Sequence, residues 1–264
     1  MGDKPQVGKF YMQKRVEQDR GVMIVTGGGR GIGAAVARLG AARGYAVAVN
    51  FESNEAAAAD VVSYICENGG RATAVRADIA NEQDVVRLFD AAQAGYGPVT
   101  ALVNSAGIPG TRRRLMDMAV SELTRVLDVN LYGALLCVRE AMCRMSISGG
   151  GEGGGIVLLS SQVAETGGNQ LATYAAAKGG INVLTKALAR EVSGEGIRIN
   201  ALSPGVIATD QQPLDDGAWV DRMRSSIPLG RLGEPLDIAT AALWLLSDEA
   251  AYINGAILGV TGGR

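Results

Sequence analysis

The chain has 264 residues, of which 47% are hydrophobic and 20% are charged, enough for one large α/β domain with a proper core. Its formal net charge of −2 argues against a nucleic-acid partner, which usually requires a basic face, and no apolar run reaches the ~18 residues of a membrane span. The sequence contains no histidine, which excludes Ser-His-Asp triads and histidine-based zinc sites, so acid–base chemistry must use Tyr, Lys, Asp, Glu or Cys.

The chain begins with a polar stretch, residues 1–20, which has no clean periodicity and which we expect to be a mobile leader outside the fold. This stretch lacks the apolar segment of a signal peptide. The three cysteines form no Cys-x-x-Cys pair and are typical of buried thiols in a reducing compartment. We therefore expect a cytoplasmic protein with a single domain over residues 21–264.

A glycine-rich stretch follows the first apolar run and organises the rest of the chain. The run Val22–Val25 stops at Gly27, Gly31 and Gly33, and an Ala-rich amphipathic run, Ala34–Arg43, begins at once. Glycine permits positive φ and close approach to the backbone, and a helix that begins there directs free N–H groups at a ligand. Phosphate is the usual ligand at such a turn. A glycine-rich turn that binds nothing is the alternative interpretation.

Strand-like and helix-like runs then alternate along the chain. The predicted strands are Val22–Val25, Ala46–Phe51, Ala72–Ala77, Ala101–Asn104, Gly155–Leu159, Arg198–Ser203 and Ala256–Val260. The predicted helices are Ile32–Arg43, Glu55–Asn68, Glu82–Ala94, Val120–Met145, Ala175–Val192 and Leu236–Leu246. Because strands that are apolar throughout alternate with helices, we expect an α/β fold: a doubly wound, Rossmann-like, seven-stranded parallel sheet with helices on both faces.

Small or polar residues follow most of the predicted strands. In an open parallel sheet, ligands bind outside the carboxyl ends of the strands, where the strand order reverses. These ends carry Thr26–Gly33, Asn50–Ser53, Ala77–Ile79, Asn104–Gly107, Ser160–Ser161 and Pro204–Gly205. This pattern is consistent with a long ligand that crosses the edge of the sheet.

Three side chains suited to proton transfer lie between residues 161 and 178. Ser161 ends the fifth predicted strand, and Tyr174 and Lys178 are four residues apart, which places them on one face of a helix. A lysine beside a tyrosine favours the phenolate, so we expect Lys178 to lower the pKa of Tyr174 from about 10. Such a tyrosine can exchange a proton with a carbonyl or alcohol oxygen held by the serine. We choose Ser161 over Ser160 from its spacing to Tyr174. Only one of the two can be catalytic, because alternation along a strand points the two serines to opposite faces.

Taken together, these motifs resemble those of the short-chain dehydrogenases/reductases of the compact type, over about Gly21 to Gly263. The motifs that carry the resemblance are Thr26-Gly27-x3-Gly31-Ile32-Gly33, Asp78, Asn104-x-Ala106-Gly107, Asp128-Val129-Asn130, Ser161 with Tyr174-x3-Lys178, Pro204-Gly205 with Thr209, and Asn254-Gly255 with Gly262-Gly263. Two positions depart from the family pattern: Ser105 stands where a second asparagine is usual, and Thr261 where an aspartate is usual.

The resemblance implies a nicotinamide-dependent oxidoreductase that moves hydride between the cofactor and a carbonyl or secondary alcohol of a small-molecule substrate. Tyr174 would be the acid/base, and Ser161 would orient the substrate oxygen. Lys178 would bind the nicotinamide ribose, and Asn130 would hold a helix kink and a proton-relaying water. No metal is expected, and the implied cofactor-binding set is Gly27, Arg30, Gly31, Ile32, Gly33, Glu52, Ser53, Asp78, Ile79, Asn104, Ala106, Gly107, Tyr174, Lys178, Pro204, Gly205, Ile207 and Thr209.

The residues expected near the ribose 2′ position give conflicting signals. Arg30 can bind a 2′-phosphate and favours NADP(H), and Ser53 adds a hydroxyl donor. Glu52, an acid about twenty residues past the glycines, is the usual partner of a free 2′-hydroxyl and favours NAD(H). In the family the NAD-selecting acid usually falls one residue earlier, at Phe51 here, so Glu52 would swing outward or pair with Arg30. We expect NADP(H) to be favoured, with some use of NAD(H).

Two other classes of function stay open at this point. An epimerase or dehydratase of nucleotide sugars can share the Tyr-Lys pair but needs a substantial substrate domain, and only about sixty residues follow Pro204. A dinucleotide-binding regulator without turnover would be expected to have a broken Ser-Tyr-Lys set.

Other stretches bear on assembly and substrate. The long apolar helices and the family resemblance imply a homotetramer, built as a dimer of dimers. We expect the segment Asp210–Leu229 to cover the pocket without identifying the substrate. The run Arg112–Arg114 is either a solvated charge run or a device that captures an acidic substrate or carrier.

Overall fold

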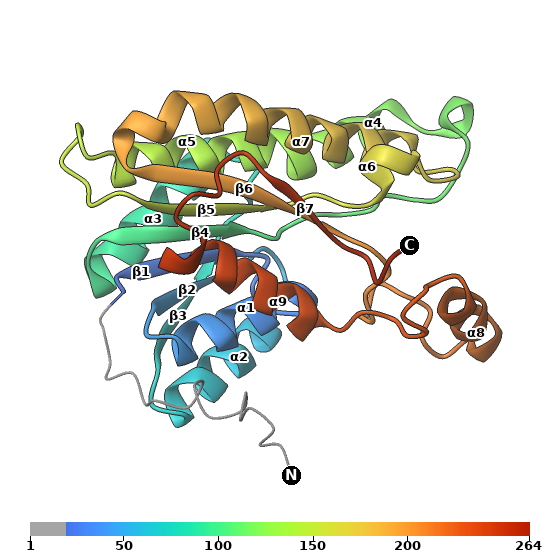
Figure 1. Cartoon of the computed structure of the whole chain (residues 1–264), viewed down its shortest axis with the longest axis horizontal. Helices are drawn as coiled ribbons and strands as arrows, with labels where there is room; N and C mark the ends of the chain where they lie inside the picture. Colours follow the sequence, from blue (N-terminus) through green and yellow to red (C-terminus); the bar gives the residue numbers. More distant parts are fainter. Residues whose placement is uncertain (1–19) are drawn as a thin grey trace, which may run out of the picture.

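A seven-stranded parallel sheet lies at the centre of the computed structural model, which describes residues 20–264 (Figure 1). Its strands are β1 (Val22–Thr26), β2 (Ala46–Phe51), β3 (Arg71–Arg76), β4 (Val99–Asn104), β5 (Gly154–Leu159), β6 (Ile197–Pro204) and β7 (Ile257–Val260). In space the order is β3-β2-β1-β4-β5-β6-β7, with every neighbouring pair parallel. The order reverses between β1 and β4, so the predicted doubly wound sheet is confirmed. The predicted leader lies, apart from Arg20, outside the described residues.

The strands form where the sequence is apolar because helices cover both faces of the sheet. Every residue of β1 and β2 is buried, as is nearly all of β4, β5 and β6. Parallel strands covered on both faces consist of continuous apolar runs rather than alternating ones. For this reason the predicted strands agree with the observed strands to within two residues at either end.

Two layers of helices enclose the sheet (Figure 1). One layer consists of α1 (Gly31–Ala42), α2 (Glu55–Glu67) and α9 (Pro235–Leu245), and the other of α3 (Glu82–Tyr96), α5 (Gly133–Met145) and α7 (Ala172–Val192). Val36 and Ile238 belong to the first apolar core, and Leu136 and Ile181 to the second. None of the helices within residues 20–264 is long and apolar enough to cross a membrane.

The predicted helix Val120–Met145 is not continuous. It consists of α4 (Val120–Leu127), a π-helical turn at Asp128–Tyr132, and α5. The side-chain amide of Asn130 donates both to the carbonyl of Val126, within the same helix, and to the carbonyl of Ile108 in the loop after β4, each at 2.8 Å. These side-chain bonds replace part of the regular ladder of backbone hydrogen bonds in the helix. A side chain that inserts into this ladder is a recognised cause of helix kinks.

Several short helical elements were not predicted. They are α6 (Val163–Thr166), α8 (Gly217–Ser225) and 3₁₀ turns at Leu115–Asp117, Ser193–Glu195 and Asp248–Ala250. The helix α8 lies within the segment expected to cover the pocket, and Figure 1 shows it on an arm that extends away from the sheet. The carboxylate of Asp216 caps it by accepting from the backbone N–H of Trp219 at 3.0 Å.

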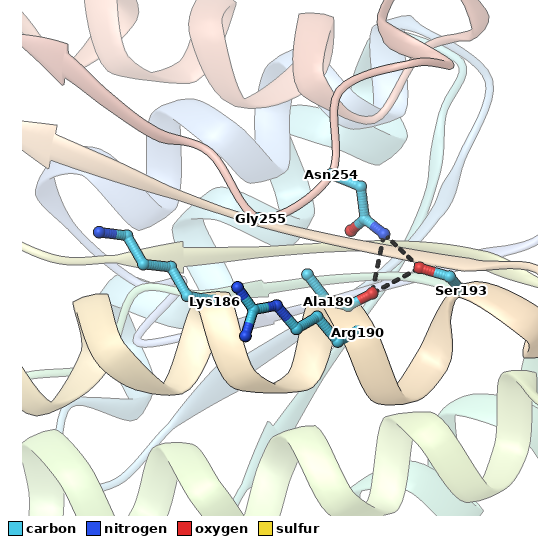
Figure 2. A pocket seen from close by; sticks show the side chains of 6 residues that line it. All are labelled: Lys186, Ala189, Arg190, Ser193, Asn254 and Gly255. Carbon is cyan, nitrogen blue, oxygen red and sulfur yellow. Dashed lines mark hydrogen bonds between the residues drawn. The ribbon is translucent and has the colours of Figure 1, made fainter.

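Asn254 ties the end of α7 to the last two strands. Its amide nitrogen donates to the carbonyl of Ala189 at 3.0 Å and to the hydroxyl of Ser193 at 2.9 Å, as Figure 2 shows. Its amide oxygen accepts from the backbone N–H of Ile199, in β6. Asn254 is also one wall of a surface pocket whose other residues include Arg190. The asparagine therefore joins a helix end, a strand and the loop before β7.

We predict that Asn254→Ala lowers the free energy of unfolding by about 1–2 kcal/mol, because its hydrogen bonds to Ala189, Ser193 and Ile199 are lost together and the backbone N–H of Ile199 loses its acceptor. Urea denaturation measures the change. The matched control is Asn68→Ala at the end of α2, where the side chain makes one exposed bond to the carbonyl of Tyr64; its expected cost is below about 0.5 kcal/mol. Equal losses in the two variants would contradict the role of Asn254.

Candidate active site

The turn after β1 forms a cradle with no room for side chains. Gly27 and Gly31 have φ of +61° and +51°, and a Cβ on Gly33 would collide with the carbonyl oxygen of Gly27. The helix α1 begins at Gly31, and no side chain caps its first N–H groups. A helix start of this kind fits a diphosphate, because its backbone N–H groups and dipole favour an anion. These residues therefore fit the dinucleotide implied by the sequence.

Two buried polar residues outside the predicted set hold this turn in place. Asn50 accepts from the backbone N–H of Gly27 at 3.2 Å and donates to the carbonyl of Ala77 at 3.0 Å, which joins the turn to β2 and β3. Thr26 donates to the amide oxygen of Asn104 at 3.0 Å and accepts from the backbone N–H of Ala106 at 3.1 Å. Both residues could have been identified from the sequence by their position, because each is a polar residue at the end of an apolar strand.

The other predicted cofactor residues lie on the loops at the same edge of the sheet. Asp78 and Ile79 follow β3, and the Asp78 carboxylate pairs with Arg125 at 2.9 Å. Residues Asn104 to Gly107 end β4 and begin the next loop, and Pro204 and Gly205 do the same for β6. Ile207 is buried and forms a bridge with Gly233, while Thr209 packs against Gly31, whose added Cβ would lie 3.3 Å from the Thr209 Cγ2. The partly buried Ile32 is in the first turn of α1.

The region expected near the ribose 2′ position is exposed and charged. Glu52 and Ser53 follow β2 and are exposed, and Arg76 donates to the backbone carbonyl of Glu52 at 3.0 Å. Arg30 does not pair with Glu52, which was one of the two possibilities raised from the sequence. Its guanidinium instead binds the carboxylate of Asp210, with 2.7 Å between Nη1 and Oδ2. Arg76 was missed because its place beside Glu52 depends on the register between β2 and β3.

The predicted catalytic side chains lie together at this edge. Ser161 follows β5, and Tyr174 and Lys178 are one turn apart on α7. The side chains of Tyr174 and Ser161 are close enough for Ser161 to lower the pKa of Tyr174, and the Lys178 Nζ lies 5.7 Å from the centre of the Tyr174 ring. Lys178 is buried and donates to the carbonyl of Leu159 at 2.6 Å. Ser160 is buried and donates to the Lys178 backbone carbonyl at 3.2 Å, so the two serines are used differently.

Burial decides the electrostatics of this cluster. It raises the pKa of Tyr174, and the nearby Ser161 side chain opposes that increase. It also lowers the pKa of Lys178 to about 8. Our expectation that Lys178 lowers the pKa of Tyr174 is therefore not met in the chain alone, because removal from water disfavours both the phenolate and the ammonium. A lysine with this pKa can gain or lose a proton near neutral pH.

Asn130 adds a buried acceptor beside the same cluster. Its amide nitrogen is used by the kink, and its Oδ1 is a buried oxygen with no hydrogen-bond partner among residues 20–264. A Cβ added to Gly107 would lie 2.7 Å from this oxygen and 3.5 Å from the Lys178 Nζ, so Asn130, Gly107 and Lys178 share one small space. Buried polar atoms normally have partners, and an orphan acceptor here fits a bound hydroxyl group or water.

The arginine run after β4 is not part of this cluster. Arg112, Arg113 and Arg114 are all exposed; Arg113 approaches Glu122 at 4.0 Å and Arg114 approaches Asp117 at 3.9 Å. Such exposed pairs contribute little stability. Among residues 20–264 no group of three or more His, Cys, Asp or Glu side chains could hold a metal ion.

Comparisons with known proteins agree with this geometry. A family model described as Enoyl-(Acyl carrier protein) reductase matches residues 27–264. The chain is 42% identical over 245 residues to the Uncharacterized oxidoreductase YgfF of Escherichia coli (strain K12), which covers 92% of this chain and 99% of that protein. It is 40% identical over 251 residues to 3beta-hydroxysteroid dehydrogenase 1 of Eggerthella lenta, which covers 91% of this chain and 92% of that protein.

A solved structure is similar as well. The crystal structure of a dehydrogenase/reductase from Sinorhizobium meliloti 1021 matches with a TM-score of 0.87 and 34% identity, covering 94% of this chain and 96% of that chain. Family model, relatives and structure all extend over almost the whole chain. The chain therefore belongs to the short-chain dehydrogenases/reductases, and it is an NAD(P)-dependent oxidoreductase that acts on hydroxyl or carbonyl groups.

Proposed function

We propose that this oxidoreductase favours NADP(H) and interconverts a small carbonyl compound and its secondary alcohol, with Tyr174 as the acid/base. The observation that carries the proposal is the cluster of Ser161, Tyr174 and Lys178 at the edge of the sheet, beside a turn that fits a diphosphate. A phenol, a hydroxyl and an amine at one edge of the sheet can hold one substrate oxygen and move one proton to it.

The proposed roles follow from the chemistry of each side chain. The nicotinamide, when bound, supplies or accepts the hydride. In reduction, the Tyr174 hydroxyl donates its proton to the substrate oxygen as that oxygen gains charge, and Ser161 donates a hydrogen bond to the same oxygen. Because burial raises the pKa of Tyr174, its hydroxyl is protonated at neutral pH and ready to act as the acid. In oxidation the same groups work in reverse.

Lys178 is proposed to restore the proton on Tyr174. Its lowered pKa of about 8 keeps proton exchange accessible near neutral pH. The orphan Oδ1 of Asn130 lies in the same space and would hold the water through which that proton reaches solvent. Lys178 would also hydrogen-bond the nicotinamide ribose, together with Asn104 and the loop after β4.

The preference for NADP(H) is supported by two cations near the end of β2. Arg30 is the last residue before α1, with an extended backbone and an exposed guanidinium, and Arg76 lies at the base of the Glu52 loop. An arginine binds a phosphate through parallel N–H bonds, which no neutral 2′-hydroxyl can match. Glu52 is exposed, and among residues 20–264 its carboxylate forms an ion pair with neither arginine, so it can turn outward.

A cytoplasmic, homotetrameric enzyme is the proposed context. Cys66, Cys137 and Cys143 are free thiols, as in a reducing compartment. The expectation that all three are buried is wrong, because only Cys137 is buried while Cys66 and Cys143 are exposed. The outer surfaces of α4, α5 and α7 expose large apolar side chains, among them Val120, Leu127, Leu135 and Val183, the last of which is 69% exposed. Apolar side chains on a helix that already covers a sheet favour burial against a second copy.

We predict that Tyr174→Phe loses nearly all turnover but still binds cofactor, since only the proton-carrying hydroxyl is removed. Steady-state kinetics against a panel of ketones, with cofactor titrated by fluorescence, measure both. The control is Tyr252→Phe, because that side chain is fully exposed. Activity of Tyr174→Phe within about tenfold of wild type, roughly 1.4 kcal/mol of barrier, would rule out the assigned role.

A second prediction concerns the cofactor. Arg30→Ala should weaken NADP(H) use more than NAD(H) use, since it removes the phosphate's partner, and Glu52→Arg should sharpen the preference for NADP(H). The ratio of kcat/KM for the two cofactors is the measurement. Arg38→Ala is the control, because Arg38 lies on α1, the helix that follows Arg30, and is stacked on Tyr64. A wild-type preference for NAD(H) above about tenfold, with the ratio unchanged in Arg30→Ala, would assign the ribose to Glu52 instead.

The third prediction concerns assembly. Light scattering at micromolar concentration should give a mass of four chains, and Val183→Glu should lower it, because a buried unpaired charge opposes association. Tyr64→Glu, on α2 at the other face of the sheet and also exposed, should leave the mass unchanged. A monomeric wild-type protein would refute the tetramer.

A further inference from the structure

The pair between Arg30 and Asp210 joins two parts of the chain with different tasks. Arg30 ends the glycine-rich turn, and Asp210 begins the segment expected to cover the pocket. Their side chains meet at 2.7 Å, although both stay more than half exposed. The residues adjacent to this pair in the sequence are also in contact, because Thr209 lies against Gly31. The contact therefore bridges the cofactor turn and the base of the covering segment.

Few other contacts hold this segment. No residue of α8 is buried, and within residues 210–229 Ile227 is the buried apolar side chain. Leu229 adds a backbone bond to the carbonyl of Gly262 at 3.1 Å. Of the ion pairs in the described part of the chain, only the one between Arg30 and Asp210 links residues 210–229 to the cofactor turn. At its first residue the segment thus depends on the same guanidinium that is proposed to bind the cofactor phosphate.

We propose that Asp210 determines cofactor specificity by competing with the 2′-phosphate for Arg30, so that phosphate binding also frees the base of the covering segment. The proposal rests on the proposed preference for NADP(H). A 2′-phosphate carries nearly two negative charges at neutral pH and takes bidentate bonds, so it displaces a single exposed carboxylate. Exposed ion pairs contribute little stability, which makes the exchange inexpensive.

The same competition weakens the binding of NADP(H). While Asp210 stays near Arg30, it repels an arriving phosphate and withholds a donor from it, whereas a free 2′-hydroxyl meets neither effect. Asp210 therefore weakens NADP(H) binding selectively and leaves NAD(H) binding untouched. This accounts for weak discrimination in a chain whose turn carries an arginine suited to phosphate.

Binding titrations on the full chain test the proposal without any substrate. NADPH and NADH are titrated by fluorescence into wild type, Asp210→Asn, Arg30→Ala and the control Asp215→Asn, an exposed residue of the same segment that is in no ion pair among residues 20–264. Asp210→Asn should tighten NADPH by about threefold to tenfold and change NADH by less than twofold, as removal of one nearby charge predicts. Asp215→Asn should change neither cofactor.

Hydrogen exchange gives the second readout. Amides of residues 211–225 should exchange faster in Asp210→Asn than in wild type, and faster in wild type once adenosine 2′,5′-bisphosphate is bound, but not with adenosine 5′-phosphate. Equal tightening of NADPH and NADH binding in Asp210→Asn, or no change in both the titrations and the exchange rates, overturns the inference. In that case, a wild-type preference for NADPH that Arg30→Ala abolishes still leaves the proposed function standing. A wild-type chain that binds NADH as tightly as NADPH overturns the proposed preference and this inference with it.

Discussion

The reversal of strand order between β1 and β4 is the constraint on which the rest of the structure depends. Right-handed crossovers send the helices after these strands to opposite faces, so the two loops part and leave the start of α1 open. Thr26 and Asn104 bridge the crevice at its base, where the two strands still pair. The phosphate cradle and the loop beside Lys178 therefore lie next to each other as a result of topology.

Burial then gives the cluster its chemistry. Lys178 is buried and bound to the carbonyl of Leu159, in a place where an ammonium is costly, and its Nζ lies 5.7 Å from the centre of the Tyr174 ring. The kink in the neighbouring helix brings Asn130 to the same space, because its side chain substitutes for backbone bonds that the π-helical turn gives up. The lowered pKa of Lys178 is thus a result of packing rather than of residue type alone.

Much of the fold could be predicted because its strands are apolar on both faces and helices must cover them. Apolar periodicity did not predict the break at Asp128–Tyr132, since it continues through this turn and the cause is one side chain that reaches a distant loop. Only the family resemblance, which implied a helix kink at Asn130, indicated it. The helix α8 was missed because none of its residues is buried, so no apolar face marks it. The candidate catalytic residues were found from spacing, and their roles stay predictions. The pKa of Tyr174 could not be predicted, since it depends on burial that the sequence does not show.

The exposure of α8 has a consequence for how such an enzyme changes over time. Residues 211–226 contribute almost nothing to either apolar core, so substitutions there carry little penalty in folding free energy. The glycine turn and the Tyr174 cluster, by contrast, are built from close contacts that tolerate almost no added atoms. Selection can therefore exchange the surface of this segment while the glycine turn and the Tyr174 cluster stay intact. New substrates become accessible to such a scaffold through drift in its least stable part, and a segment grafted from a relative would test that freedom directly.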